Sequence, residues 1–402
     1  MSSASNTETQ QDRGSNQASL RAYNERLVLS LVRRQGGLAK ADIARATGLS
    51  AQTVSVIMRG LERDGLLIRG KPVKGRVGQP SVPMHLAPDG AYAIGLKIGR
   101  RSADLALMNF VGEVQQQIHK VYPYPMPEPI LDFAEGGIKG LLASLPKARL
   151  GRVAGVGIAT PFELWNWAEE VGAPRDQMEA WRDVDLAAAL GERCPLPMFS
   201  QNDATAACGA ELILGRGAEH ADFVYFFIGS FVGGGIVLNN AVFTGRSGNA
   251  GALGSMPMPT TNCRARQLIE EGSIYVLEKQ LRAAGIDPSP LWLEPEGWTE
   301  FAGHLDAWID HTSKSLAHAI VASCSVIDFP TAIIDGGFPA HVREAIVAAT
   351  QVAVTKLDLQ GIQPPEILEG SIGGNARVIG GASLPFFARY LVDQSLLFKA
   401  SA

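Results

Sequence analysis

Two stretches of this 402-residue chain repeat one pattern, and this repeat constrains the fold more than any other feature. Residues 93–114 and 224–245 each read as an apolar strand ending in Ile-Gly, a turn, a second strand and a further turn. The segments align on Gly99 and Gly229. Helices and strands alternate along the rest of this region, which predicts an α/β body. We therefore expect a duplicated α/β lobe with a cleft between the two copies.

The charge of the chain is divided unevenly between its two ends. Residues 1–90 carry 13 Lys and Arg against 7 Asp and Glu, a net charge of +6. The remainder carries 23 against 33, a net charge of −10. A small basic domain on a larger acidic one is typical of a nucleic-acid-binding head joined to a domain with a different partner.

Composition and pattern divide the chain into four segments. Residues 1–19 are polar and almost free of large apolar side chains, which predicts a disordered tail. Residues 20–86 predict a winged helix-turn-helix domain, residues 87–91 a short linker, and residues 92–402 the two-lobed body. The overall fold class is therefore α/β, with an N-terminal winged helix-turn-helix in front of it.

The predicted head consists of three helices followed by a β-hairpin. Apolar spacing predicts the helices, and Ser50 is a good N-cap for the third of them. The strands enclose the basic sequence KPVKGRVGQP, which predicts a flexible wing. The expected elements are helices from Asn24 to Gly36-Gly37, over 40–47 and over 51–63, and strands over 66–69 and 81–86.

The outward face of the third predicted helix suits the major groove of DNA. Gln can form two hydrogen bonds to one adenine, and Ser and Thr can form hydrogen bonds to base edges or phosphates. Arg can contact phosphates or enter a narrow minor groove. The expected DNA-binding residues are Gln52, Thr53, Ser55 and Arg59 on the helix and Arg76 on the wing. The alternative is a three-helix scaffold whose polar face meets only water; the turn, the wing and the positive charge favour DNA binding.

Five motifs in one order make the chain similar to a known family. They are QNDATAACGAE (201–211), GSFVGGGIVLN (229–239), GNAGALGSM (248–256), IIDGG (333–337) and SIGGNARVIGGA (371–382). From about residue 24 to the C-terminus the chain resembles the ROK family (repressors, open reading frames and sugar kinases), in its winged-helix branch. The resemblance implies two actin-like lobes with a hexose in the cleft, where family repressors sense a sugar.

The resemblance also implies a sugar site. Asn202 and Asp203 match the pair that, in family kinases, bonds the sugar and removes the proton of the attacked hydroxyl. Glu270 matches a further polar contact. Read without the family, Asn202-Asp203 is also a plain capping pair for a helix over 204–214, and that alternative stays open.

Departures from the family pattern argue against kinase activity. Where family kinases carry Asp-x-Gly-Gly-Thr for phosphate and magnesium, this chain has Lys97-Ile98-Gly99-Arg100-Arg101. In the second phosphate loop, Gly-Thr-Gly becomes Gly229-Ser230-Phe231, which puts a benzyl group where backbone should approach phosphate. We therefore expect no nucleotide cofactor and no catalytic residue, with Asp203 a degenerate base position.

The family's zinc site is eroded as well. The positions matching its sugar-binding Glu and its ligand His are Ala252 and Ser255, and of its cysteines only Cys263 remains. Tetrahedral zinc needs four ligands, so we expect no bound metal. Trp165 and Trp167 lie near the loop that borders the family's cleft, where they either stack on a sugar or serve ordinary packing.

The N-terminus has no apolar signal region and no apolar run reaches 18 residues, which predicts a cytoplasmic protein. The expected partners are operator DNA, a sugar or sugar derivative, and a second copy in a homodimer or homotetramer, without a membrane. These observations predict a sugar-responsive transcriptional regulator, in the sense of a repressor of carbohydrate genes. The alternatives are an active ATP-dependent sugar kinase with an accessory head, which Asp203 favours, and a DNA-binding scaffold whose cleft has lost its sugar.

Overall fold

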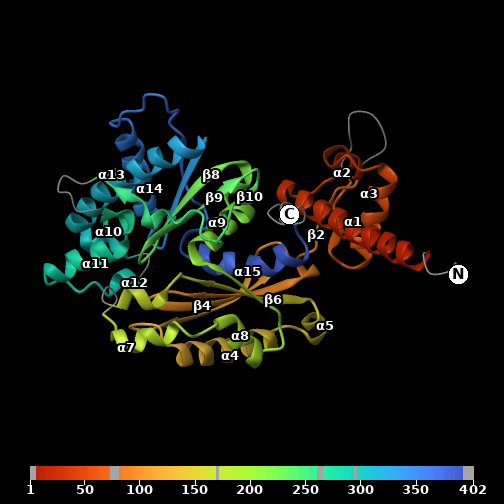
Figure 1. Ribbon diagram of the computed structural model, residues 1–402, viewed down its shortest axis with the longest axis horizontal. Coiled ribbons are helices and arrows are strands. Elements are labelled where there is room, and N and C mark those ends of the chain that lie inside the picture. Colours follow the sequence, from red (N-terminus) through yellow and green to blue (C-terminus); the bar gives the residue numbers. More distant parts are fainter. Residues whose placement is uncertain (1–5, 73–80, 169–171, 260–265, 294–296, 393–402) are drawn as a thin grey trace.

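The computed structural model describes residues 6–72, 81–168, 172–259, 266–293 and 297–392. A small helical head lies beside a body of two lobes, and each lobe is built on one five-stranded sheet (Figure 1). No helix of the described segments is long and apolar enough to cross a bilayer.

The head has the predicted helix-turn-helix and hairpin. Gly48 ends the second helix in the left-handed conformation at φ 69°, and the Ser50 side chain accepts the backbone N–H of Thr53 at 3.1 Å to begin the third. The buried positions of the third helix are the predicted ones: Val54, Ile57, Met58 and Leu61. The elements are α1 (Asn6–Gln35), α2 (Lys40–Thr47), α3 (Ala51–Arg63), β1 (Leu67–Arg69) and β2 (Met84–Leu86).

Two details of the head differ from the sequence prediction, and the tip of its wing is not described. Helix α1 begins at Asn6, so residues 6–19 are helical where a disordered tail was expected, because a helix already nucleated by its apolar part gains one bond per added residue. Strand β2 begins at Met84 rather than Ser81. The wing residues 73–80, and with them Arg76, lie outside the described residues.

The N-terminal lobe is a mixed sheet in the order β5-β4-β3-β6-β7. Every residue of its central strand β3 is buried, since helices α4 and α8 cover one face and α15 the other (Figure 1). The elements are β3 (Tyr92–Ile98), β4 (Ser102–Asn109), β5 (Val114–Val121), α4 (Pro127–Ser144), α5 (Lys147–Leu150), β6 (Val153–Thr160), α7 (Arg175–Met178), α8 (Leu186–Arg193) and β7 (Met198–Asn202).

The C-terminal lobe repeats this plan in the order β10-β9-β8-β13-β14. The sheet elements are β8 (Phe223–Ile228), β9 (Val232–Leu238), β10 (Ala241–Val242), β13 (Thr331–Gly336) and β14 (Glu366–Glu369). The others are α9 (Asp203–Leu214), β11 (Pro257–Met258), β12 (Arg266–Gln267), α10 (Leu268–Gly272), α11 (Ile274–Ala283), α12 (Pro290–Leu293), α13 (Ala302–Ile327), α14 (Ala340–Val354) and α15 (Ala376–Arg389).

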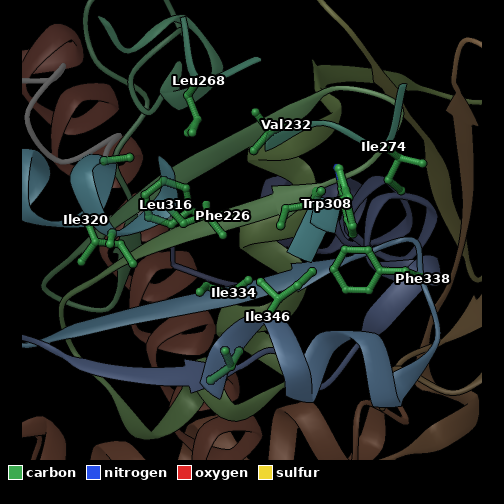
Figure 2. Packing of buried hydrophobic residues seen from close by; sticks show 14 of the residues in the cluster. Phe226, Val232, Leu268, Ile274, Trp308, Leu316, Ile320, Ile334, Phe338 and Ile346 are labelled. Atoms are coloured by element: carbon green, nitrogen blue, oxygen red, sulfur yellow. The ribbon is translucent and has the colours of Figure 1, made fainter. Parts of the chain in front are cut away.

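The core of the C-terminal lobe lies between its sheet and helices α13 and α14 (Figure 2). Trp308 and Phe338 meet edge to face with ring centroids 6.4 Å apart, the geometry that aromatic quadrupoles favour. This packing fixes the lobe whose turns face the cleft.

The predicted internal repeat is present as two antiparallel hairpins. Strands β3 and β4 pair from Ile98 with Ala103, and strands β8 and β9 pair from Ile228 with Val232. Gly99 and Gly229 lie in the two corresponding turns. The duplication therefore places one glycine turn of each lobe toward the space between them.

Candidate functional site: the cleft and the recognition helix

A cavity of about 320 Å³ opens where the two lobes meet, a size that suits a small ligand. Its walls come from both hairpin turns, the loop after β6, the start of α9, the loop over 249–255, and α15. The residues lining it are Gly99, Arg100, Pro161, Phe162, Glu163, Asn202, Asp203, Ala204, Thr205, Phe227, Ser230, Phe231, Val232, Gly233, Gly234, Asn249, Gly251, Ala252, Gly254, Ser255, Ile269 and Arg377.

Asn202 and Asp203 both reach this cavity, where strand β7 ends and helix α9 begins. The Asn202 side chain accepts the backbone N–H groups of Ala204 at 3.1 Å and Thr205 at 3.2 Å, so it caps the helix as the open alternative described. Capping holds Asn202 in place and leaves its amide nitrogen available to a ligand. The two readings of the pair are therefore compatible.

Arg377 is the partner of Asp203 and was not predicted. Its Nη1 lies 3.3 Å from Asp203 Oδ2, its guanidinium carbon lies 4.9 Å from the Phe227 ring centroid, and both charged side chains are mostly buried. The guanidinium therefore occupies one oxygen of the Asp203 carboxylate. The signal was present in SIGGNARVIGGA, which sequence analysis used only as a family motif.

Lys97 does not enter the cavity, which corrects the expectation that its charge fills the phosphate site. Its Nζ donates to Ser102 Oγ at 2.7 Å and to Asp104 Oδ2 at 3.0 Å, on the neighbouring strand β4. Burial, with the positive charge of Arg377 nearby, lowers the pKa of Lys97 to about 8. The cation is therefore held within the sheet of the N-terminal lobe.

Arg100 and Phe231 close the cleft together, one from each hairpin turn. The Arg100 guanidinium carbon lies 4.0 Å from the Phe231 ring centroid, which is cation–π distance, and the Phe231 ring packs against Tyr275 at 4.9 Å. The benzyl group predicted to obstruct the second phosphate loop thus lines the cavity under a guanidinium. Bulk and positive charge therefore meet where the two hairpin turns face each other.

A second contact joins the lobes beside this stack. Arg101 in the β3–β4 turn donates to Glu278 of helix α11 at 3.1 Å, and Glu278 is almost fully buried. Because both partners are shielded from water, this ion pair is screened less than a surface pair. Arg100 and Arg101 therefore tie the turn of the N-terminal lobe to the C-terminal lobe.

The remaining predicted ligand positions are only partly brought together. Ala252 and Ser255 line the cavity, and neither side chain offers the imidazole or thiolate that zinc requires. Cys263 lies outside the described residues. Glu270 is exposed and does not line the cavity, because its carboxylate accepts the Gln267 N–H at 3.0 Å in a capping box. The local cap explains why this carboxylate points elsewhere.

Phe162 is an exposed aromatic residue at the cleft, where sequence analysis considered Trp165 and Trp167. Phe162 lines the cavity with 47% of its side chain exposed. Trp165 packs against the core of the N-terminal lobe, with Arg182 over its ring at 5.5 Å. Trp167 belongs to the short helix η2 (Leu164–Trp167), and its side chain is outside the described ones.

Helix α3 lies on the outer side of the head (Figure 1). Gln52 and Arg59 are exposed, and Thr53 and Ser55 are half-buried. The Thr53 hydroxyl pairs with Ser50 Oγ at 2.9 Å, and Arg59 Nε donates to the Ser55 carbonyl at 3.2 Å. Gln52 and the tip of Arg59 are therefore the side chains that a DNA groove meets first.

Both parts of the chain match known families. Residues 93–272 match the ROK family, and residues 23–76 match the MarR family. The chain combines a ROK domain with a MarR-type winged helix. Both halves of the predicted fold class, the winged helix-turn-helix and the ROK body, are thereby confirmed.

Curated relatives of this chain include named repressors. The xylose repressor of Bacillus subtilis (strain 168) is 24% identical over 269 residues, which cover 66% of this chain and 68% of the repressor. The DNA-binding transcriptional dual regulator NagC of Escherichia coli (strain K12) is 24% identical over 283 residues, covering 69% of this chain and 67% of NagC.

Solved structures show the same fold at lower identity. A ROK family transcriptional regulator, described as a homologue of the E. coli MLC protein, aligns with a TM-score of 0.67 and 20% identity over 94% of this chain and 98% of that chain. A ROK family glucokinase from Streptomyces griseus, solved with glucose and AMPPNP, aligns with a TM-score of 0.55 and 18% identity over 73% of this chain and 99% of that one. The ROK fold is thus shared by regulators and kinases.

Proposed function

We propose that this protein is a sugar-responsive DNA-binding transcriptional regulator, a repressor whose affinity for its operator changes when a carbohydrate occupies the cleft. The observation that carries the proposal is the combination of two features in one chain. One is the exposed helix α3, and the other is a cleft like that of sugar kinases, in which Phe231 of the second phosphate loop lies under Arg100. The names of the relatives, xylose repressor and the regulator NagC, support the same role. A DNA-binding role fits the cytoplasm.

On the DNA side, helix α3 enters the major groove. Gln52 reads a base edge, Thr53 and Ser55 approach the backbone, and Arg59 neutralises phosphate, with Arg76 of the wing in the adjacent minor groove. Two heads of a homodimer, or of a dimer within a homotetramer, then meet half-sites about one helical turn apart.

On the sugar side, Asn202 and Asp203 bond hydroxyl groups at the bottom of the cavity. Phe162 at the edge of the cavity offers an aromatic face to the C–H side of the sugar ring. Sequence analysis considered the tryptophans for this contact. Arg377 holds the Asp203 carboxylate toward the cavity. The sugar is bound without zinc and without nucleotide.

Sugar kinase activity is the competing function, and the presence of Asp203 in the cleft favours it. Two features oppose it: the carboxylate is paired with Arg377, and Arg100 with Phe231 takes the place of phosphate-binding backbone. The preferred reading is therefore a cleft that binds carbohydrate and transfers nothing.

One pair of measurements separates the two functions. The sugars to test are D-xylose, N-acetylglucosamine and glucose. The relatives include a xylose repressor and an N-acetylglucosamine repressor, and the similar glucokinase was solved with glucose. Without nucleotide, a bound sugar raises the melting temperature by mass action, and we expect this for at least one of them. With ATP and magnesium, we expect no sugar-dependent release of ADP. Steady ADP release would establish the kinase, and a flat thermal response would remove the sensor.

A further inference from the structure

Helix α15 has one end in the cleft and the other in the hydrophobic core of the head. Its second residue, Arg377, lines the cavity, and Phe386 near its last turn is fully buried in a cluster that also contains Val28 and Val32 of helix α1. The helix lies across the middle of the molecule in Figure 1. It is therefore a direct physical connection between the two proposed binding sites.

The cleft end of α15 is held by an ion pair that a ligand can change. Arg377 Nη1 donates to Asp203, whereas its Nε is buried without a hydrogen-bond partner among the described residues. A buried donor without a partner costs about 1–3 kcal/mol. A sugar hydroxyl that bonds Asp203 or this nitrogen therefore alters what holds the first turn of the helix.

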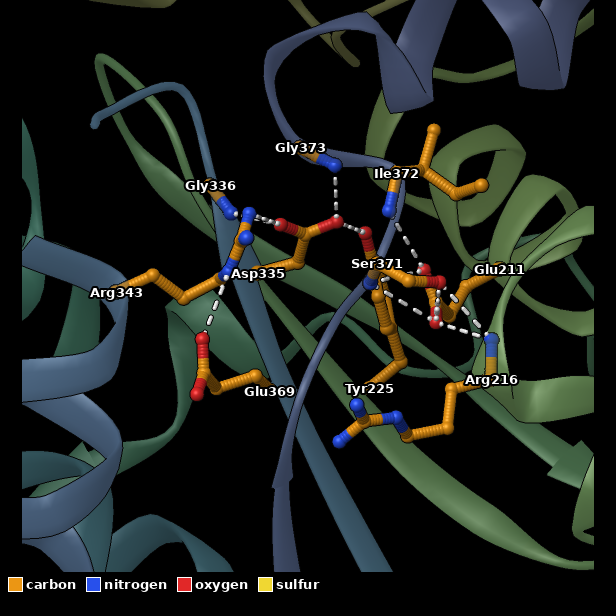
Figure 3. A network of polar contacts seen from close by, with 10 residues as sticks. All are labelled: Glu211, Arg216, Tyr225, Asp335, Gly336, Arg343, Glu369, Ser371, Ile372 and Gly373. Carbon is orange, nitrogen blue, oxygen red and sulfur yellow. Dashed lines mark hydrogen bonds and ion pairs between the residues drawn. The ribbon is translucent and has the colours of Figure 1, made fainter. Parts of the chain in front are cut away.

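The loop before α15 is fixed to the C-terminal lobe by buried carboxylates (Figure 3). Glu211 of α9 accepts the backbone N–H of Ser371 at 3.1 Å, and Asp335 at the end of β13 accepts that of Gly373 at 2.9 Å. Arg343 completes the arrangement by donating to Asp335 at 3.3 Å. The start of α15 therefore has a fixed anchor, about which its remaining length can tilt.

The middle of α15 packs backbone to backbone on its neighbours. A Cβ added at Gly157 of strand β6 would lie 1.8 Å from the Gly381 carbonyl oxygen, and one added at Gly380 would lie 2.0 Å from the Ala206 oxygen of α9. No flexible side chain separates these surfaces, and close-packed interiors transmit small displacements. If α15 shifts, strand β6 and helix α9 therefore move together with it.

The far end of α15 is part of the head's own core. Phe386 meets Phe110 edge to face at 5.4 Å, and the Arg33 guanidinium of α1 lies 5.8 Å from both ring centroids. Just past the helix, the Val392 N–H donates to Ser30 Oγ of α1 at 2.9 Å. Helix α1 is thus attached to α15 by the Arg33–Phe386 cation–π contact and to the residue Val392 beyond it by a hydrogen bond.

Arg33 is the position where this attachment is most sensitive. Burial lowers its pKa to about 10, and its Nε and Nη1 are buried without hydrogen-bond partners among the described residues. A desolvated guanidinium costs several kcal/mol, and here two ring faces and the Phe110 carbonyl compensate it. Small movements of Phe386 therefore have a large effect on the helix that carries the head.

We infer that α15 transmits the state of the cleft to the winged helix: Arg377 is the positioning residue that responds to the effector, and Arg33 is the residue through which the head responds. This inference rests on the proposed function, since the effector is the sugar in the cleft. Under this inference, operator binding is regulated by a movement of α15, which contacts the cleft through Arg377 and the head through Arg33.

The test uses the full-length chain with Arg33→Met, and with Arg34→Met as matched control because Arg34 is the exposed neighbour on the same helix. Operator affinity is measured with and without whichever of D-xylose, N-acetylglucosamine and glucose raises the melting temperature of the wild type. Wild type and Arg34→Met should show the same sugar-dependent change, in the typical range of about 5–150-fold. Arg33→Met should keep the thermal shift by that sugar while its change in operator affinity falls below about 2-fold.

Phe386 is the partner of Arg33 on α15, and Phe386→Leu keeps an apolar side chain there. We expect this variant also to lose the sugar-dependent change in operator affinity. It replaces Arg33→Met in the test if that variant does not fold. A full sugar response of both variants would overturn the coupling while leaving the sugar sensor intact. If no sugar shifts the melting temperature of the wild type, the proposed function fails first, and the coupling fails with it.

Discussion

At the scale of single residues, the decisive feature is the pairing of Asp203 with Arg377. A general base must be ready to accept a proton, whereas this carboxylate faces a guanidinium at 3.3 Å, with both side chains mostly buried. We propose that the residue that the family uses for chemistry serves here as a fixed acceptor for hydroxyl groups.

A double-mutant cycle measures this pair. Asp203→Ala leaves the Arg377 charge buried without its partner, so we expect a loss of about 3 kcal/mol in the free energy of unfolding. Adding Arg377→Met removes the stranded charge and should recover a large part of that loss. Urea unfolding of the four proteins gives the coupling. Strictly additive effects would show that the two residues do not interact in solution.

Phe162 allows a separate test of the sugar's position. Removing the ring with Phe162→Ala should weaken sugar binding by roughly 1 kcal/mol, whereas Phe162→Tyr keeps the aromatic face and should bind like the wild type. Titration calorimetry without nucleotide measures both. Equal affinity of the alanine and tyrosine variants would exclude stacking on this ring.

Local motifs predicted the site residues that lie beside them in sequence and missed those that tertiary structure brings in. Asn202 and Asp203 follow a strand and begin a helix, so their place at the cleft followed from the motif. Arg377 is 174 positions away from Asp203, and its motif SIGGNARVIGGA does not show which residue it pairs with. Lys97 and Glu270 were misplaced because nearby partners, Asp104 and the Gln267 N–H, bind them outside the cavity.

At the scale of elements, helix α3 decides what the head recognises. Gln52 is exposed near the start of the helix, and the oxygen and nitrogen of its side-chain amide can both form hydrogen bonds with adenine. Gln52→Ala should therefore cost about 1–3 kcal/mol on the operator and much less on random DNA. Fluorescence anisotropy at one fixed salt concentration measures both affinities. An equal loss on the two DNAs would make Gln52 a backbone contact.

The loop that precedes α15 predicts a pH dependence of stability. Burial, together with the nearby charge of Glu211, raises the pKa of Asp335 from its ordinary value of 3.8 to about 6. The folded state therefore holds this proton more tightly than the unfolded state. The resulting stabilisation is complete below pH 4 and is lost as the pH rises through 6, by about 1.4 kcal/mol per unit of pKa shift.

Asp335→Asn cannot titrate and isolates this contribution. The difference in unfolding free energy, wild type minus variant, should decrease between pH 4.5 and pH 7. Urea unfolding at these two pH values measures it. A difference that is constant or grows with pH would show that the carboxyl is not protonated preferentially in the fold.

Elements with strong local signals were predicted closely. Helices over 40–47 and 51–63 have the predicted bounds because Gly48 and Ser50 punctuate them. The two hairpins of the repeat were predicted from strand runs and their glycine turns. Helix α1 was predicted too short, since residues 6–19 lack the apolar stripe on which the periodicity argument depends.

At the scale of the whole molecule, the head and body share one core. Sequence analysis expected residues 87–91 to be a linker, and the structure buries Ala87, Gly90 and Ala91 between the two parts. Arg152 of the body donates to the Gly90 carbonyl at 2.9 Å and reinforces the joint. Apolar spacing predicted that one face of α1 is buried, but such spacing does not show what covers the face, and the structure packs it in one cluster with Phe110 and Phe386 of the body.

The central claim is that carbohydrate in the cleft changes DNA binding by the head. The most direct measurement is the affinity of the wild-type chain for an operator obtained by in-vitro selection, at fixed salt, with and without D-xylose, N-acetylglucosamine and glucose. We predict that the sugar that raises the melting temperature also changes operator affinity by at least about 5-fold in the absence of ATP. A sugar that binds the cleft and leaves operator affinity unchanged would contradict the account.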